Sequence, residues 1–160
     1  CLSKLHRQIF DKNLGLPNID NINCSMWSNE DLDLIKSLNS TPKIPRFAII
    51  ESSNPIKKTA QTITYCQKAQ IPYDLIQAPT HHEFLSVLAQ YEGLVFQTGH
   101  PEPTPRVAVE AKMLNCKFLS QKEVIGVAHE DWFHLNGDKL IEEVRAMRDA
   151  ACIKLEKILA

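Results

Sequence analysis

The feature that most constrains the fold is a regular alternation of short apolar runs with amphipathic, helix-length segments between residues 46 and 120. Short runs that are apolar without interruption are typical of strands buried on both faces of a sheet. When such strands alternate with helices, right-handed βαβ crossovers produce a parallel sheet covered by helices on both faces. We therefore predict an α/β fold with a Rossmann-like parallel sheet. The expected strands are 46–51, 73–77, 93–97 and 117–120, and the expected helices are 55–70, 81–91 and 105–115.

Three more helices are predicted outside this alternation. Apolar residues recur at helical spacing in the segments 2–12 and 138–160. Ser28 precedes the third segment, 29–38, and Asp31 lies three residues further on. A hydroxyl residue followed at that distance by an acid indicates a capping box at the start of a helix.

The stretch from Asn39 to Pro45 is rich in Ser, Thr and Pro, which indicates a boundary between two parts of the chain. We expect residues 1–42 to form a helical appendage or interdomain segment, and residues 43–160 to form the Rossmann-like domain. A length of 160 residues fits one such domain with a short appendage. The first residue is Cys1 rather than Met, which suggests a fragment of a longer protein.

Composition excludes several classes of function. The chain has 18 Lys and Arg against 19 Asp and Glu, a formal charge of −1, so it has no overall basic field to attract nucleic acid. No apolar run approaches the roughly 20 residues of a membrane helix. The five cysteines are far apart, with no C-x-x-C pair and no metal-ligand spacing. We interpret them as reduced, mostly structural thiols of a cytoplasmic protein.

The loops most informative about function follow the strands, because ligands of open parallel sheets bind outside the carboxyl ends of the strands. The loop after the first strand reads Ser52-Ser53-Asn54-Pro55, and Thr104-Pro105 ends the loop after the third. A capping side chain followed by proline is expected to open each following helix and to present free backbone N–H groups to an anion.

Lys57 and Lys58 fall in the first turn of the predicted helix 55–70, where the helix macrodipole disfavours cations. Two interpretations are open. In one, a bound diphosphate compensates the lysines, held by an ammonium group and by Ser or backbone N–H groups. In the other, both ammonium groups point into water.

Two acids, Glu102 and Glu110, flank the start of the predicted helix 105–115. In helical projection Glu110 falls between Met113 and Leu114, on an otherwise apolar face. An unpaired carboxylate there would cost several kcal/mol to desolvate. We therefore expect it to bond a ligand, backbone groups or Arg106, one turn earlier.

The spacing E-x7-E, with the second glutamate followed by alanine, resembles the signature of retaining GT-B glycosyltransferases. The similarity covers roughly residues 46–135 and is carried by three pieces of sequence. These are Ser53-Asn-Pro-Ile-Lys57, Gly93-Leu-Val-Phe, and Pro105-Arg-Val-Ala-Val-Glu110-Ala-Lys.

The resemblance implies a role for each matching residue. Glu110 would accept hydrogen bonds from the ribose of a nucleotide diphosphate sugar, and Glu102 would hold the hydroxyls of the transferred hexose. Lys57 would neutralise the diphosphate, with Ser53 beside it and the N–H groups after Thr104 cradling the phosphates. The family usually has an arginine where this chain has Ser52 or Ser53, and a glycine where it has Pro105. Arg106 is the candidate to supply the missing positive charge.

These implications give a hypothesis for function: the C-terminal, donor-binding domain of a retaining hexosyltransferase, with Glu102 and Lys57 as its catalytic pair. The donor is a substrate, so no cofactor is expected. The acceptor would be a saccharide or another hydroxyl compound, bound by an N-terminal domain that this chain lacks. Two alternatives remain open, namely a nucleotide-sugar-binding or interaction module without transfer activity, and a GT-B-fold epimerase.

The histidines are weaker candidates. His81 and His82 are expected at the solvated start of helix 81–91, with a contact to a nucleobase as the alternative. His129 and His134 lack the H-E-x-x-H spacing and a further nearby ligand, so no metal site is expected there.

Overall fold

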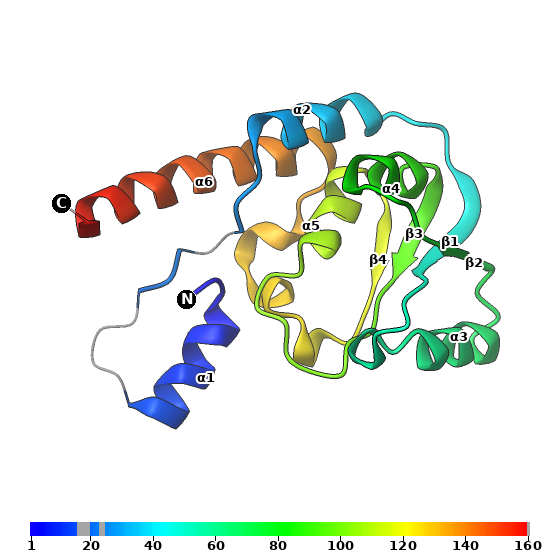
Figure 1. Cartoon of the computed structure of the whole chain (residues 1–160), viewed down its shortest axis with the longest axis horizontal. Coiled ribbons are helices and arrows are strands. Elements are labelled where there is room, and N and C mark those ends of the chain that lie inside the picture. Colours follow the sequence, from blue (N-terminus) through cyan, green and yellow to red (C-terminus); the bar gives the residue numbers. More distant parts are fainter. Residues whose placement is uncertain (16–19, 23–24, 160) are drawn as a thin grey trace.

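In a computed structural model, which describes residues 1–15, 20–22 and 25–159, the chain forms an α/β fold built on a four-stranded, all-parallel sheet (Figure 1). The strand order is β2-β1-β3-β4, so the chain moves from β1 to one neighbour, β2, and then returns past β1 to β3 and β4. The predicted Rossmann-like arrangement is confirmed. The strands are β1 (Ile44–Ile50), β2 (Tyr73–Ile76), β3 (Tyr91–Val95) and β4 (Lys117–Leu119).

Each face of the sheet has its own apolar core. Helix α3 (Thr59–Lys68) packs on one face, where Cys66 meets Ile49 and Val95. Helices α4 (His81–Leu88) and α5 (Arg106–Met113) pack with a larger cluster that contains Ala48 and Leu94. Neighbouring residues along β1 and β3 therefore point to opposite cores, as the alternation of side chains in a strand requires.

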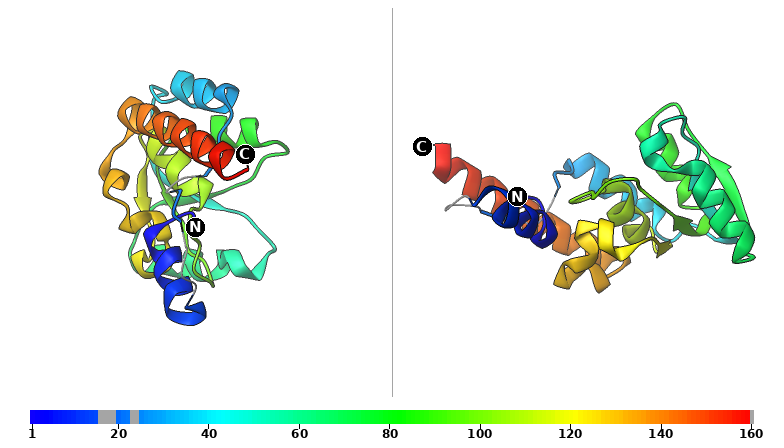
Figure 2. Two further views of the ribbon diagram at one scale, coloured as in Figure 1. Left: turned by 90° about the vertical axis from the view of Figure 1, so that its left-hand side faces the viewer. Right: turned by 90° about the horizontal axis from the view of Figure 1, so that it is seen from below.

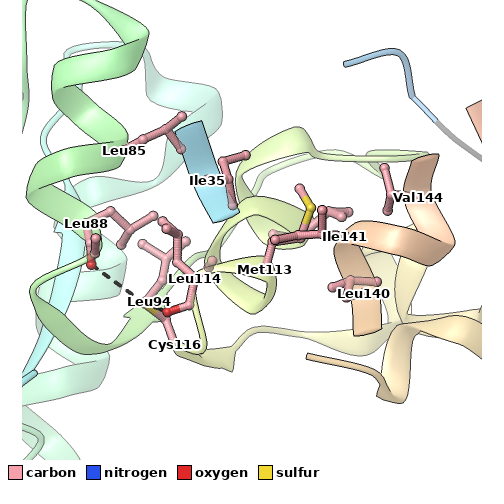
Figure 3. Packing of buried hydrophobic residues seen from close by; sticks show 14 of the residues in the cluster. Ile35, Leu85, Leu88, Leu94, Met113, Leu114, Cys116, Leu140, Ile141 and Val144 are labelled. Atoms are coloured by element: carbon pink, nitrogen blue, oxygen red, sulfur yellow. Dashed lines mark hydrogen bonds between the residues drawn. The ribbon is translucent and has the colours of Figure 1, made fainter. Parts of the chain in front are cut away.

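A further layer covers α4 and α5 on the side away from the sheet (Figure 1). It consists of α2 (Asn29–Leu38) and α6 (Gly137–Leu159), and Leu140, Ile141 and Val144 of α6 are fully buried against the same core (Figure 3). The later turns of α6 extend beyond the rest of the molecule, and Leu155 there is 40% exposed (Figure 2).

The segment predicted as a helical appendage, residues 1–42, contributes directly to this core. Trp27, Leu32 and Ile35 are buried in the cluster that contains α4, α5 and α6. The capping box predicted at the start of α2 is confirmed, with the Asp31 N–H donating to the Ser28 hydroxyl. Helix α1 (Lys4–Leu14) contacts the turn η3 (Gly126–His129) that follows η2 (Lys122–Val124).

The prediction of one continuous helix over 55–70 is wrong. The segment begins as a 3-10 turn, η1 (Pro55–Lys57), and Lys58 then adopts a left-handed backbone conformation with φ 47°. Because side chains disfavour that conformation inside a helix, η1 ends there and α3 starts afresh at Thr59. The Thr59 hydroxyl hydrogen-bonds the carbonyls of Ile50 and Ser52, which ties the new helix to the end of β1.

Capping by Thr104 is also corrected. Pro105 occupies the cap position of α5 and makes no side-chain cap bond, while the Thr104 hydroxyl donates to the Leu2 carbonyl at 2.9 Å. The hydroxyl thus holds the N-terminal segment instead of the helix.

Three further findings concern membrane spans, the cysteines and Trp132. Among the described residues, no helix has the length and apolar character needed to cross a membrane. Cys1, Cys66, Cys116 and Cys152 are free thiols, and Cys24 lies outside the described residues. Trp132, in η4 (Asp131–His134), is buried in the main core.

Candidate functional site

A cavity of about 390 Å³ lies at the carboxyl end of β1, where the order of the sheet reverses between β1 and β3. This reversal point is where open α/β sheets bind their ligands, because the two adjoining connections leave toward opposite faces. Its polar lining comes from the segments that follow β1 and β3 and from helices α4 and α5. Its apolar walls are Ile50, Phe84, Pro105 and Val107. The charged or titratable lining residues are Lys57, His81, Glu102, Arg106 and Glu110.

Lys57 and Glu102 meet across the ends of the strands. Nζ of Lys57 lies 3.0 Å from Oε1 of Glu102 and 5.2 Å from the centre of the Phe96 ring. Lys57 is placed by η1, while Glu102 belongs to the loop after β3. The two loops that leave β1 and β3 are therefore joined by a half-buried ion pair at the cavity.

The Glu102 backbone is fixed by a short bridge to the segment after β4. Its N–H donates to the Val124 carbonyl, and its carbonyl accepts from the Gly126 N–H, each at 2.8 Å. These bonds hold Glu102 as a single parallel bridge partner of Ile125. The position of the acid thus depends on a segment that lies more than twenty residues away in the sequence.

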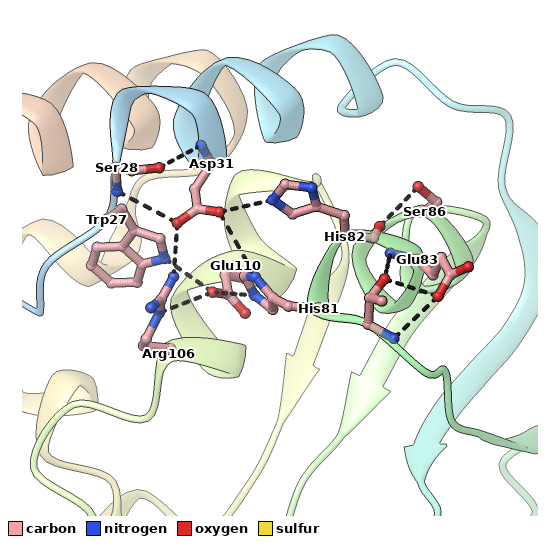
Figure 4. A network of polar contacts seen from close by, with 10 residues as sticks. Trp27, Ser28, Asp31, His81, His82, Glu83, Ser86, Arg106 and Glu110 are labelled. Carbon is pink, nitrogen blue, oxygen red and sulfur yellow. Dashed lines mark hydrogen bonds and ion pairs between the residues drawn. The ribbon is translucent and has the colours of Figure 1, made fainter.

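Glu110 is 2% exposed, which confirms that this acid faces the interior. Three donors converge on its Oε1: the Trp27 indole N–H at 3.0 Å, Nε2 of His81 at 3.1 Å and Nε of Arg106 at 3.3 Å (Figure 4). Of the three kinds of partner expected for this carboxylate, Arg106 is present. Because all hydrogen bonds of this carboxylate within the described structure go to Oε1, its Oε2 is the oxygen left for a ligand.

Asp31 stands behind Glu110 and extends the network to the second histidine. Its Oδ1 lies 3.2 Å from Nε2 of His82, and its Oδ2 lies 3.4 Å from Nη2 of Arg106 (Figure 4). Burial alone would raise the pKa of Asp31, but hydrogen bonds from His82 and Ser28 together with the Arg106 charge lower it below its ordinary value.

His81 is the link between the two carboxylates. Its hydrogen bond to Glu110 raises the pKa of His81 above the ordinary value, with burial opposing that effect. The expectation that His81 and His82 lie at the start of α4 is confirmed, but neither imidazole is simply solvated.

Ser53 and Thr104 are not among the side chains that line the cavity. The loop that contains Ser53 also uses its own N–H groups: Ile56 donates to Asn54 Oδ1, Lys57 to the Asn54 carbonyl and Lys58 to the Pro55 carbonyl. The N–H groups of Ile56, Lys57 and Lys58 are therefore not free for an anion. At the other helix, the first turn of α5 does line the cavity through Arg106 and Val107, whose N–H groups have no acceptor within the helix.

Sequence reasoning missed the contribution of Trp27 and Asp31. Each belongs to the turn that opens α2, and each contacts α5 from a part of the chain predicted to lie outside the domain. One available signal was the position of Trp27 directly before the Ser28 cap, where a hydrophobic residue often packs against the first turns of the helix.

The charges of the site favour a ligand that carries both an anion and hydroxyl groups. Lys57 and Arg106 supply positive charge, whereas Glu102 and Glu110 supply acceptors for hydroxyl donors. A volume of about 390 Å³ falls toward the small end of the usual range for ligand pockets, roughly 300–1,000 Å³.

Comparison with protein-family models, with curated proteins and with solved structures found no match to this chain.

Proposed function

We propose that this chain is the donor-binding domain of a retaining glycosyltransferase that uses a nucleotide diphosphate sugar. One observation carries the proposal: Lys57, Glu102 and Glu110 line a single cavity at the reversal point of the sheet. These are the residues for which the resemblance to GT-B enzymes implies donor contacts. They come from two loops and a helix that are separate in the sequence, so their convergence is independent support for a shared ligand.

In this proposal the domain acts on the donor mainly through electrostatics. Lys57 and the first turn of α5 stabilise the charge that grows on the departing diphosphate, a contribution that is often the largest in catalysis. Glu102 accepts hydrogen bonds from the hexose, and Oε2 of Glu110 accepts one from the ribose. Arg106 pairs with both Glu110 and Asp31 and so balances part of the negative charge beside the cavity.

A binding module without transfer activity is the second candidate, and two observations favour it. Lys57 is already paired with Glu102, and the N–H groups of η1 are already used within the chain. Both features leave less positive potential for a diphosphate than a free lysine beside a phosphate-binding loop would. Such a module would bind the sugar portion more strongly than the phosphates.

Calorimetry with this chain tests the proposal. Nucleoside diphosphates of each base, their hexose esters and the parent nucleosides are titrated into the wild type, Lys57→Gln and the control Lys58→Gln. Lys58 is the adjacent lysine and does not line the cavity. We expect Lys57→Gln to weaken diphosphate ligands by roughly tenfold at low salt, less at high salt, and to leave nucleosides unchanged.

Equal losses in the two lysine variants, or no binding of any nucleotide diphosphate, would overturn the proposal. Binding of a hexose ester that is insensitive to Lys57→Gln identifies the second candidate instead. Transfer activity itself requires the acceptor-binding domain that this proposal implies, and its readout is release of the nucleotide from the sugar ester.

A further inference from the structure

Two helices bring three metal-binding side chains together beside the cavity. Asp31 lies in the first turn of α2, and His81 and His82 are the first two residues of α4. One ligand atom from each side chain, two imidazole nitrogens and a carboxylate oxygen, all lie within 4.8 Å of one another. Zinc bonds of about 2.0–2.2 Å in a tetrahedron place ligand atoms roughly 3.3 Å apart, so small side-chain rotations suffice to close this set around an ion.

The orientation of His81 is the observation that points to a cation. Its Nε2 is 3.1 Å from the buried Oε1 of Glu110, while its Nδ1 faces Oδ1 of Asp31 at 3.8 Å. Nε2 is thus anchored by one carboxylate, and Nδ1 faces a second carboxylate oxygen across a gap longer than a hydrogen bond. A cation that binds both Nδ1 and Oδ1 would occupy this gap.

Glu110 has the geometry of a carboxylate that supports a metal-bound histidine. Histidine ligands usually donate their other ring N–H to a carboxylate or carbonyl, which fixes the tautomer and orients the ring. Here the supporting oxygen is also held by Trp27 and Arg106, so the acceptor for His81 is rigid. The ring is thus set with Nδ1 toward Asp31.

We propose that Nδ1 of His81, Nε2 of His82 and Oδ1 of Asp31 form a binding site for a divalent transition metal of the zinc class. Two imidazoles and one carboxylate suit zinc and similar ions, whereas calcium and magnesium take oxygen ligands only. The side chains of the histidines are 40% and 60% exposed, so water completes the tetrahedron from the solvent side.

Two features around this site matter: the nearby charge of Arg106 lowers its affinity for a metal ion, and its ligands come from two different helices. Nη2 of Arg106 lies 3.4 Å from Oδ2 of Asp31, the oxygen that the metal does not use, and its charge opposes that of the ion. With only three protein ligands and the positive charge of Arg106 nearby, we expect the site to bind zinc in the micromolar range. Because the ligands come from α2 and α4, a bound ion links the turn that carries Trp27 to the sheet-packed helix.

Zinc alone is the probe for the test, so the result is separate from nucleotide binding. The chain is stripped with a chelator, its accessible thiols are alkylated because Cys152 is exposed, and Zn²⁺ is titrated in competition with a chromophoric chelator. His82→Ala is compared with His134→Ala, a matched control on an exposed histidine outside the cluster.

We expect one zinc ion per chain, a rise in Tm on loading, and shifts of the ring-nitrogen NMR signals of His81 and His82 alone. His82→Ala and Asp31→Asn should weaken binding by tenfold or more, and Glu110→Gln, which leaves all three ligands in place, by about tenfold. His134→Ala should bind like the wild type.

Absence of binding up to 1 mM zinc would overturn the site, as would unchanged affinity in His82→Ala. So would NMR spectra in which both ring nitrogens of His81 stay protonated as zinc is added. Each of these outcomes leaves the nucleotide titrations unaffected, so failure of the metal site and failure of the proposed function can be told apart.

Discussion

Nζ of Lys57 lies 3.0 Å from Oε1 of Glu102, which joins the first lysine after β1 to the acid that follows β3. The two side chains are 35% and 23% exposed, so the pair is partly removed from water. A ligand phosphate that approaches Lys57 must therefore share the ammonium group with Glu102. A hexose hydroxyl that donates to Glu102 can leave the pair intact.

The first prediction follows from this competition. Glu102→Gln should free Lys57 and raise affinity for a nucleoside diphosphate severalfold, while the extra affinity contributed by the hexose falls. Calorimetry with the diphosphate and its hexose ester, side by side, measures both quantities. If the substitution leaves both affinities unchanged, Glu102 contacts neither part of the ligand.

The second prediction concerns Glu110, whose Oε1 accepts from three donors in a nearly inaccessible position. Glu110→Gln keeps the volume and one acceptor but removes the charge that strengthens bonds from Arg106 and His81. The free energy of unfolding should fall by roughly 1–3 kcal/mol, in addition to weaker nucleotide binding.

Urea denaturation checks this value, with Glu102→Gln as the matched control. Because Glu102 is more exposed, its substitution should change stability by only about 0.5 kcal/mol. If the two variants were equally stable, the negative charge of Glu110 would add nothing to the free energy of unfolding.

The parts of the fold that sequence predicted are those encoded locally. Apolar runs separated by amphipathic helices sufficed for the parallel sheet, and helical projection sufficed to place Glu110 in the interior. Each pattern lies within a single helix or strand, where the spacing of apolar residues shows which face is buried.

The parts that sequence did not predict depend on contacts between distant segments. Trp27 reaches Glu110 across 83 residues, and the Thr104 hydroxyl bonds Leu2 rather than its own helix across 102 residues. The break at Lys58 follows from the anchoring of Thr59 to the end of β1. Capping rules consider only hydrogen-bond partners that are close in the sequence. At Thr104 the hydroxyl instead bonds a carbonyl from a distant segment.

A third prediction tests the edge of the sheet as a function of pH. Arg46 donates from Nε and Nη2 to both oxygens of Asp74, each at 2.7 Å, across the β1–β2 pair. This hydrogen bonding lowers the pKa of Asp74 below its ordinary value, and burial opposes that effect. A carboxyl whose pKa is lower in the folded state stabilises the fold above its unfolded pKa, about 3.9, and loses that effect as pH falls through the folded pKa.

Asp74→Asn should therefore be less stable than the wild type at pH 6, and the difference should shrink as the pH falls below about 4. Urea denaturation across this range measures it. Because the pair is partly exposed, high salt should also reduce the difference at pH 6. A stability difference that is constant with pH would show that the loss comes from the amide itself rather than from the charge.

The last prediction concerns Gly126, which positions Glu102 through the backbone. A Cβ at Gly126 would lie 2.1 Å from the Pro103 carbonyl oxygen and 2.5 Å from the Ser3 hydroxyl, so no side chain fits. Gly126→Ala must push the loop of Glu102 away and break the 2.8 Å bond from its N–H to the Glu102 carbonyl. We expect a loss of about 1–3 kcal/mol in the free energy of unfolding.

Gly99→Ala is the matched control, since Gly99 lies in the same loop after β3. Its added Cβ would be 3.3 Å from Cε of Lys58, a flexible side chain that can move aside. Calorimetry should show that Gly126→Ala reduces the preference for the hexose ester over the diphosphate, whereas Gly99→Ala keeps it. If Gly126→Ala lowers stability but preserves that preference, the backbone bridge supports the fold without positioning Glu102, and the carboxylate must be held by Lys57 alone.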